Sequence, residues 1–203
     1  MTKPSSSEIV VVLDRSGSMQ AIAKDMEGGF DRFIQEQKLV PGDCRVSLYQ
    51  FDTQYEPVYE SRLLSEVPPM SLVPRSNTAL YDAVGRTIVA TGERLAKLPE
   101  SERPAKLTFL IITDGEENAS KEYKAPRLKE MVTHQREKYG WAFVYLGTSA
   151  DTVFDAAEIL GVLPVENGGY DGGAPAPGAE TTGFISMWPT PPAFSLRHSS
   201  LKP

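Results

Sequence analysis

The chain of 203 residues contains one cysteine, Cys44, and two histidines, His134 and His198, which lie far apart. A single cysteine excludes an intramolecular disulfide and a cysteine-based zinc cluster, and the two histidines match no metal-binding spacing. Basic residues are fewer than acidic ones, 21 against 27, and no block of lysines or arginines occurs. We therefore expect a protein that does not bind nucleic acid.

Long hydrophobic runs are also missing from the sequence. No stretch of 18 apolar residues could span a membrane, and the first apolar run, 9–13, is too short for a secretory leader. We therefore expect a cytoplasmic protein that makes no membrane contact. Hydrophobic residues account for 40% of the chain and charged residues for 24%, which is the composition of a folded globular domain.

Apolar runs alternate with amphipathic runs along most of the chain. Continuous apolar runs over 8–13 and 105–113 predict strands that are buried on both faces of a sheet. Further strands are predicted over 44–51 and 141–146, together with a short edge strand over 55–60, which contains a proline. Helical spacing predicts helices over 19–38, 79–98, 123–139 and 150–160. This order predicts an α/β fold, a Rossmann-like, doubly wound, mostly parallel sheet with one short antiparallel edge strand and helices on both faces.

The composition divides the chain into three parts. Residues 1–6 are expected to form a flexible N-terminus, and residues 7–163 carry the alternating pattern of a single domain. Residues 164–203 are rich in glycine and proline and lack an apolar period, so we expect a poorly ordered tail. An apolar cluster over 184–188 is a candidate for docking onto the domain or onto a partner.

Side chains that carry oxygen stand at the ends of several predicted elements. Asp14, Ser16 and Ser18 follow the first buried strand, Asp114 follows the strand over 105–113, and Thr78 directly precedes a helix. In doubly wound sheets, ligands bind beyond the carboxyl ends of the strands, where the strand order reverses. If the two buried strands are neighbours there, these side chains meet. Two carboxylates and three hydroxyls suit Mg²⁺, with Mn²⁺ or Ca²⁺ as alternatives, better than zinc or copper.

The same five residues resemble the metal-ion-dependent adhesion site (MIDAS) of von Willebrand factor A (vWA) domains. The D-x-S-x-S motif is Asp14, Ser16 and Ser18, the motif threonine is Thr78, and the aspartate of T-D-G is Asp114. The resemblance covers about residues 7–162 and implies a vWA protein of bacterial or phage type with a complete MIDAS motif. It implies that the hydroxyls ligate a divalent ion and that an open coordination position accepts a carboxylate from a partner protein.

Charged and polar residues beside this motif are candidates for contacts with the partner. We expect Arg15, Arg75, Asn77 and Glu116 to contact it, with Arg75 donating to the incoming carboxylate. Acidic residues such as Asp52 are expected on the same rim, so that an acidic ligand should bind only when the ion is present.

Structural roles are the alternative for these residues. Serine and aspartate ahead of an amphipathic run are common helix N-caps, and Thr78 occupies a similar position. Asp82 lies one turn into a predicted helix, where a carboxylate stabilises the helix start through the helix dipole. Glu116 and Glu117 are expected to be solvated loop charges.

The sequence contains no phosphate-binding loop, dinucleotide fingerprint or nucleophile elbow. Phosphatases of the haloacid-dehalogenase type need a second aspartate two positions after the first, and Ser16 stands there. We therefore predict a non-enzymatic protein-binding module that depends on a divalent metal. The alternatives are a metal-dependent hydrolase or phosphatase and a vWA subunit of a magnesium-chelatase-like assembly, whose ATPase would act in trans.

Overall fold

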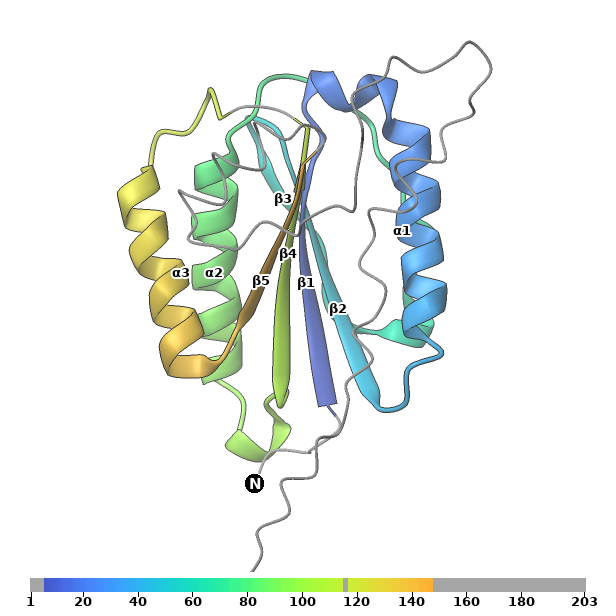
Figure 1. Ribbon diagram of the computed structural model, residues 1–203, viewed down its shortest axis with the longest axis vertical. Coiled ribbons are helices and arrows are strands. Elements are labelled where there is room, and N and C mark those ends of the chain that lie inside the picture. The colour runs from blue at the N-terminus through green and yellow to red at the C-terminus, as the bar shows by residue number, and fades with distance from the viewer. Residues whose placement is uncertain (1–5, 115–116, 148–203) are drawn as a thin grey trace, which may run out of the picture.

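The computed structural model describes residues 6–114 and 117–147, which form a layered α/β domain (Figure 1). Its sheet has the strand order β3-β2-β1-β4-β5. The strands are β1 (Ser6–Asp14), β2 (Asp43–Phe51), β3 (Tyr55–Leu63), β4 (Lys106–Thr113) and β5 (Ala142–Gly147). The α-helices are α1 (Ala23–Gln37), α2 (Leu80–Ala96) and α3 (Ala125–Tyr139), and the 3₁₀ helices are η1 (Gly17–Ala21), η2 (Leu64–Glu66) and η3 (Glu100–Glu102).

The predicted fold class is confirmed. Strand β1 pairs in parallel with β2 and β4, β4 pairs in parallel with β5, and only the pairing of β2 with β3 is antiparallel. The two strands with continuous apolar runs, β1 and β4, lie inside the sheet, and the proline-containing strand β3 lies at its edge. The helix predicted over 150–160, the first residues of the chain and the tail 164–203 lie outside the described residues.

The two faces of the sheet are covered by different helices, α1 on one face and α2 with α3 on the other (Figure 1). Alternate residues of β1 divide between these faces. Ile9 and Val11 pack in the cluster with α1, and Val10 and Val12 pack in the cluster with α2 and α3. Asp14 continues the second series at the end of the strand, so its side chain points toward the face that α2 covers.

The helix predicted over 19–38 begins later than expected. Residues 17–21 form the tighter helix η1, and α1 starts only at Ala23. Between the two, Ile22 has φ −117° and ψ 4°, outside the α-helical region, while Met19 is fully buried in the cluster beneath α1. The tight turn of η1 lets the chain leave β1, bury Met19 and still present the residues before it at the sheet edge.

Strand β3 is longer than predicted and extends to Leu63. Its pairing with β2 shifts register on both sides of Leu48, and Ser61 has φ 49°. These irregularities, which increase the local twist of an edge strand, have no signal in the sequence pattern. Among the helices that the structure describes, none is long and apolar enough to cross a membrane.

Helix α2 makes a close contact through a glycine. A Cβ atom built on Gly85 would lie 2.6 Å from the ring of Tyr123, at the entrance to α3, whereas a Cβ on Gly92 of the same helix would have no heavy atom within 4 Å. Any larger residue at position 85 must therefore displace the ring of Tyr123. At position 92 there is room for a side chain, so glycine there only lowers the stability of the helix.

We expect Gly85→Ala to lower the free energy of unfolding by about 1–3 kcal/mol, because the added methyl group displaces the ring of Tyr123. The matched control, Gly92→Ala, should raise it by about 0.5–1 kcal/mol through its effect on helix propensity. Urea unfolding of both variants measures the difference. A stabilisation of equal size in both variants would contradict the close contact.

Candidate metal centre

Asp14 ends β1 beside the end of β4. The register pairs Leu13 with Ile112, so the next residues, Asp14 and Thr113, stand side by side. The Asp14 side chain is fully buried, and Oδ2 accepts a hydrogen bond from the Thr113 hydroxyl at 2.5 Å. Oδ1 accepts a hydrogen bond from the backbone N–H of Ser16 at 2.6 Å. Both carboxylate oxygens are thus fixed in orientation before any ligand binds.

A chain of hydroxyl groups links Asp14 to the second motif aspartate. The hydroxyl of Ser18 donates to Oδ1 of Asp114 at 2.8 Å, and the oxygens of Ser16 and Ser18 lie 3.0 Å apart. Ser16 thus lies between Asp14 and Ser18, within hydrogen-bond distance of the Ser18 hydroxyl and beside the Asp14 carboxylate. Side chains from the ends of β1 and β4 therefore form one connected cluster at the edge of the sheet.

The segment that carries Thr78 lies against this cluster. The backbone N–H of Gly17 donates to the carbonyl of Ser76 at 3.0 Å, and the N–H of Arg75 donates to the carbonyl of Arg15 at 2.8 Å. A Cβ on Gly17 would lie 3.4 Å from that Ser76 oxygen, so the two backbones approach closely. Thr78 is buried, with 2% of its surface exposed. All five residues of the predicted metal set thus stand at one edge of the sheet.

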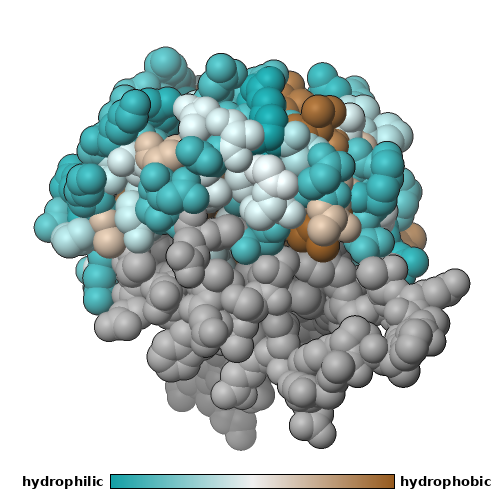
Figure 2. Space-filling model, turned by 90° about the horizontal axis from the view of Figure 1, so that it is seen from above, coloured by the Kyte–Doolittle hydropathy of each residue, from teal (hydrophilic) through white to brown (hydrophobic). Residues whose placement is uncertain are grey.

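Figure 2 shows this edge of the sheet from above, where an area of near-neutral hydropathy is bordered by hydrophilic residues. Among the described residues, no group of three or more histidine, cysteine, aspartate or glutamate side chains is arranged to hold a metal ion. A metal at this edge would depend on hydroxyl ligands as well as carboxylates.

The two motif carboxylates differ from other carboxylates on this edge in their ionisation. Burial raises the pKa of Asp14, and the nearby charge of Asp114 raises it further, which outweighs its hydrogen bonds from Thr113 and Ser16. Burial also raises the pKa of Asp114, against the hydrogen bond from Ser18. Two partly desolvated carboxylates with raised pKa values, joined by hydroxyl oxygens, fit a hard divalent cation such as Mg²⁺.

The neighbouring carboxylate of Asp52 is neutralised within the protein. Its Oδ2 accepts hydrogen bonds from Nε of Arg75 at 2.6 Å and from Nε of Arg15 at 3.1 Å. Burial alone would raise the pKa of Asp52, but these two guanidinium groups and the N–H of Gln54 lower it overall. The rim is therefore less acidic than the sequence predicts, because Asp52 is turned into the protein with 1% of its surface exposed.

The structure places the residues expected to contact a partner in different environments. Arg15 is buried and divides its guanidinium between Asp52 and Glu56, so it is not presented to the solvent. The Arg75 side chain is 49% exposed and is held by Asp52 at the edge of the cluster. Asn77 is exposed next to Thr78, and Glu116 lies outside the described residues.

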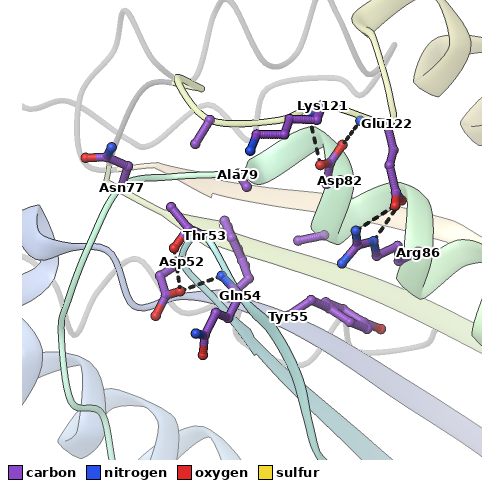
Figure 3. A pocket seen from close by; sticks show the side chains of 13 residues that line it. Asp52, Thr53, Gln54, Tyr55, Asn77, Ala79, Asp82, Arg86, Lys121 and Glu122 are labelled. Carbon is purple, nitrogen blue, oxygen red and sulfur yellow. Dashed lines mark hydrogen bonds and ion pairs between the residues drawn. The ribbon is translucent and has the colours of Figure 1, made fainter.

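A segment after β4 is bound tightly to the start of α2. The carboxylate of Asp82 accepts three backbone N–H bonds, each of 2.9 Å, from Lys121, Glu122 and Tyr123 (Figure 3 shows the first two). Asp82 lies in the first turn of α2, where the sequence placed it, and these hydrogen bonds give its carboxylate a second structural contact, with the 121–123 backbone. Its function is to hold this segment.

Glu117 is likewise not a solvated loop charge. One oxygen accepts hydrogen bonds from the N–H groups of Ala119 and Ser120, and the other accepts from the hydroxyl of Ser120 and the N–H of Tyr81. The hydroxyl of Ser120 also lies 3.0 Å from the N–H of Asp82, which donates to it. Helix α2 is therefore capped by a segment about 40 residues away along the chain.

The same segment fixes Thr78. The N–H of Thr78 donates to the side-chain oxygen of Asn118 at 3.0 Å, and the carbonyl of Thr78 accepts from the N–H groups of Asn118 and Ala119. Thr78 is not an N-cap, since the N-cap of α2 is Ala79 and makes no side-chain capping bond. Asn118 and Thr113 are positioning residues that the sequence pattern does not predict. Only the position of Thr113 directly before Asp114 could have indicated its role.

No protein-family model and no curated protein sequence matches the chain. The structure is similar to that of the manganese-loaded TRAP protein of Plasmodium vivax, with a TM-score of 0.53 and 14% identity over 82% of this chain and 66% of that chain. The chain has a vWA-like fold. A von Willebrand factor type A structure from Catenulispora acidiphila has a TM-score of 0.46 and 16% identity over 70% of this chain and 33% of that chain.

A further similar structure is proximal thread matrix protein 1 from the mussel byssus, with a zinc-occupied MIDAS motif. Its TM-score is 0.47, with 19% identity over 71% of this chain and 36% of that chain. The chain thus spans about a third of the length of the Catenulispora and mussel proteins.

We expect Asp82→Asn to lower the free energy of unfolding by about 2–3 kcal/mol at neutral pH, because the variant loses charge-assisted hydrogen bonds to three backbone N–H groups. Burial alone would raise the pKa of Asp82, but these bonds lower it below its ordinary value of about 3.9. The stabilisation is therefore complete above that value and is lost as the pH falls through the lower, folded-state pKa.

Urea unfolding across this pH range tests the prediction, and the free energies of the two proteins should converge in acid. Glu93→Gln is the matched control, since it removes an exposed carboxylate from the same helix and should change stability by less than about 0.5 kcal/mol. A pH-independent difference between wild type and Asp82→Asn would show that the charge of Asp82 does not hold the segment.

Proposed function

We propose that this chain is a non-enzymatic protein-binding module that depends on a divalent metal and engages a carboxylate of a partner protein. The metal would be Mg²⁺, held by Asp14, Ser16, Ser18, Thr78 and Asp114. The observation that carries this proposal is the hydrogen-bonded chain from Asp14 through two serines to Asp114, across the ends of β1 and β4. It gathers hydroxyl oxygens and two carboxylates with raised pKa values at the place where doubly wound sheets bind ligands.

Two of the proposed ligand residues are held in place by neighbouring groups. Thr113 and the backbone of Ser16 hold the carboxylate of Asp14, and Asn118 holds the backbone of Thr78. A bound Mg²⁺ supplies two positive charges and an exchangeable coordination position. The similar TRAP structure is manganese-loaded, which supports a divalent metal in this type of fold.

The surroundings of the cluster favour binding over catalysis. Ser16 occupies the position where a phosphatase of the type considered above needs its general acid, and its hydroxyl oxygen lies 3.0 Å from that of Ser18. Arg15, the nearest guanidinium in sequence, is committed to Asp52 and Glu56. His134 lies exposed on α3. These groups do not supply a proton donor or acceptor aimed at a substrate in the cluster.

We expect isothermal titration calorimetry to detect one Mg²⁺ or Mn²⁺ ion per chain. Asp14→Asn should abolish this binding, and Ser16→Ala and Thr78→Ala should each weaken it by about tenfold or more, because each removes an oriented oxygen donor. Since the ion binds the folded state, it should raise the melting temperature of the wild type and leave that of Asp14→Asn unchanged.

Glu100→Gln provides the control for this experiment. It also removes one carboxylate, but from η3, at the opposite end of the sheet (Figure 1). It should bind the ion as the wild type does. Equal binding by wild type and Asp14→Asn would place the metal elsewhere and overturn the proposal.

Partner binding is expected to need the metal. Immobilised wild-type protein should retain a protein from an extract in Mg²⁺ and release it in EDTA, and Asp14→Asn should retain nothing in Mg²⁺, because the buried carboxylates alone repel an acidic ligand. Glu100→Gln should behave as the wild type. Retention that is equal in Mg²⁺ and in EDTA would show that the partner does not bind through the metal.

A further inference from the structure

A cavity of about 460 Å³ lies beside the metal centre. Its walls come from three segments, the end of β2 with the following turn (51–55), the start of α2 with the residues before it (77–86), and the segment 119–122 (Figure 3). This volume is in the range of sites that bind small molecules, so it leaves room for a partner's side chain and bound water. None of the predicted metal ligands lines it, so the cavity is a separate feature of this edge.

The cavity and the metal centre share one short stretch of backbone. Asn77 and Ala79 line the cavity, and Thr78 between them belongs to the metal set. The N–H of Ala79 donates to the carbonyl of Asp52 at 3.0 Å, which joins this stretch to the opposite wall. A partner segment bound at the metal would therefore pass the mouth of the cavity within a few residues.

The lining of the cavity combines an apolar wall with hydrogen-bond donors. Phe51, Ala79 and Ala83 are buried and supply apolar surface. Arg86 forms a bidentate ion pair with Glu122, through Nε at 2.9 Å and Nη2 at 2.8 Å. The third guanidinium nitrogen, Nη1, does not take part in this pair. Figure 3 shows its guanidinium directed from α2 into the cavity.

Lys121 adds a second cation to the lining. Its backbone N–H is held by Asp82, and its side chain is exposed along one rim (Figure 3). Within the part of the chain that the structure describes, no carboxylate pairs with its ammonium group. The other carboxylates of the lining are engaged, Asp82 by three backbone N–H groups and Asp52 by two guanidinium groups. Lys121 and Arg86 thus place positively charged hydrogen-bond donors beside an apolar wall.

We infer that this cavity is a second recognition site for the same partner, and that it takes an acidic side chain, aspartate or glutamate, that lies near the metal-bound carboxylate in the partner's sequence. Its carboxylate would accept hydrogen bonds from Nζ of Lys121 and Nη1 of Arg86, and its methylene groups would lie on the apolar wall. This inference rests on the proposed function for the first carboxylate.

Two attachment points explain how a site on a common fold selects a partner. A metal with one exchangeable position accepts any accessible carboxylate, whereas a second site at a fixed separation accepts only a segment with two acidic residues at the matching spacing. Once the first carboxylate is bound, the second binds as an intramolecular step, at high effective concentration. The spacing of the two acids then decides the specificity.

Synthetic glycine peptides that carry an aspartate followed by a glutamate, with a growing number of glycines between them, provide the probe. The reference peptides carry glutamine in place of glutamate. In Mg²⁺, one spacing should bind the wild type about tenfold more tightly than its reference, as measured by NMR titration. Lys121→Gln should lose this gain, because the ammonium donor is removed while the backbone bond to Asp82 remains.

Lys124→Gln is the matched control, since Lys124 is an exposed lysine close in sequence that does not line the cavity. It should keep the gain. If no spacing binds better than its reference, or if Lys121→Gln keeps the gain, the second site is wrong and the metal site stands. If the reference peptides bind equally in Mg²⁺ and EDTA, the proposed function is wrong.

In that case a separate NMR measurement tests the cavity. The two-acid peptides should shift the amide signals of Ala79 and Lys121 in the wild type but not in Lys121→Gln.

Discussion

Two carboxylates that bind backbone N–H groups hold the functional edge of this domain together. Asp82, on the first turn of α2, accepts three hydrogen bonds from the segment after β4, and Glu117, within that segment, accepts a bond from the start of α2. The N-cap residue of helix α2 makes no side-chain capping bond. Two N–H groups of its first turn therefore find their hydrogen-bond acceptors in this segment. Because Thr78 precedes α2 and Asp114 follows β4, the same contacts set the position of one predicted ligand relative to the other.

The aspartates on this edge form two groups that differ in the direction of their pKa shifts. Hydrogen bonds from arginines or from backbone N–H groups lower the pKa values of Asp52 and Asp82, so these charges stabilise the fold. Burial raises the pKa values of Asp14 and Asp114, which receive hydrogen bonds mainly from hydroxyls and lie close enough to repel each other. Keeping these two ionised costs free energy in the protein alone. Under the proposed function, a bound divalent cation would remove this cost.

The sequence predicts the fold well because its signals are local. The apolar runs of β1 and β4 and the proline in β3 indicate which strands are central and which is an edge, and the rule on strand order then brings Asp14 and Asp114 to one place. What could not be predicted depends on contacts between distant segments. Nothing near Asp82 or Glu117 in the sequence indicates that each carboxylate accepts backbone hydrogen bonds from a segment about 40 residues away. From the sequence alone, a charged residue such as Glu117 in a predicted loop is therefore expected to be exposed to solvent. The break at Ile22 is hidden for a similar reason, since the helical spacing continues through it.

The metal centre and the cavity are parts of one hydrogen-bonded unit. Thr78 is joined to Asn118 and Ala119 through both its N–H and its carbonyl, and Ala79 is joined to Asp52. Ala79, Asp52 and Ala119 line the cavity, so the proposed metal ligand Thr78 and the walls of the cavity belong to one hydrogen-bonded network. If both proposed sites are occupied, a ligand at the first site that stabilises one arrangement of this network would stabilise the same arrangement at the second. Linkage would make this effect reciprocal, so a group bound in the cavity would change the affinity of the candidate metal centre for its ligand by the same factor.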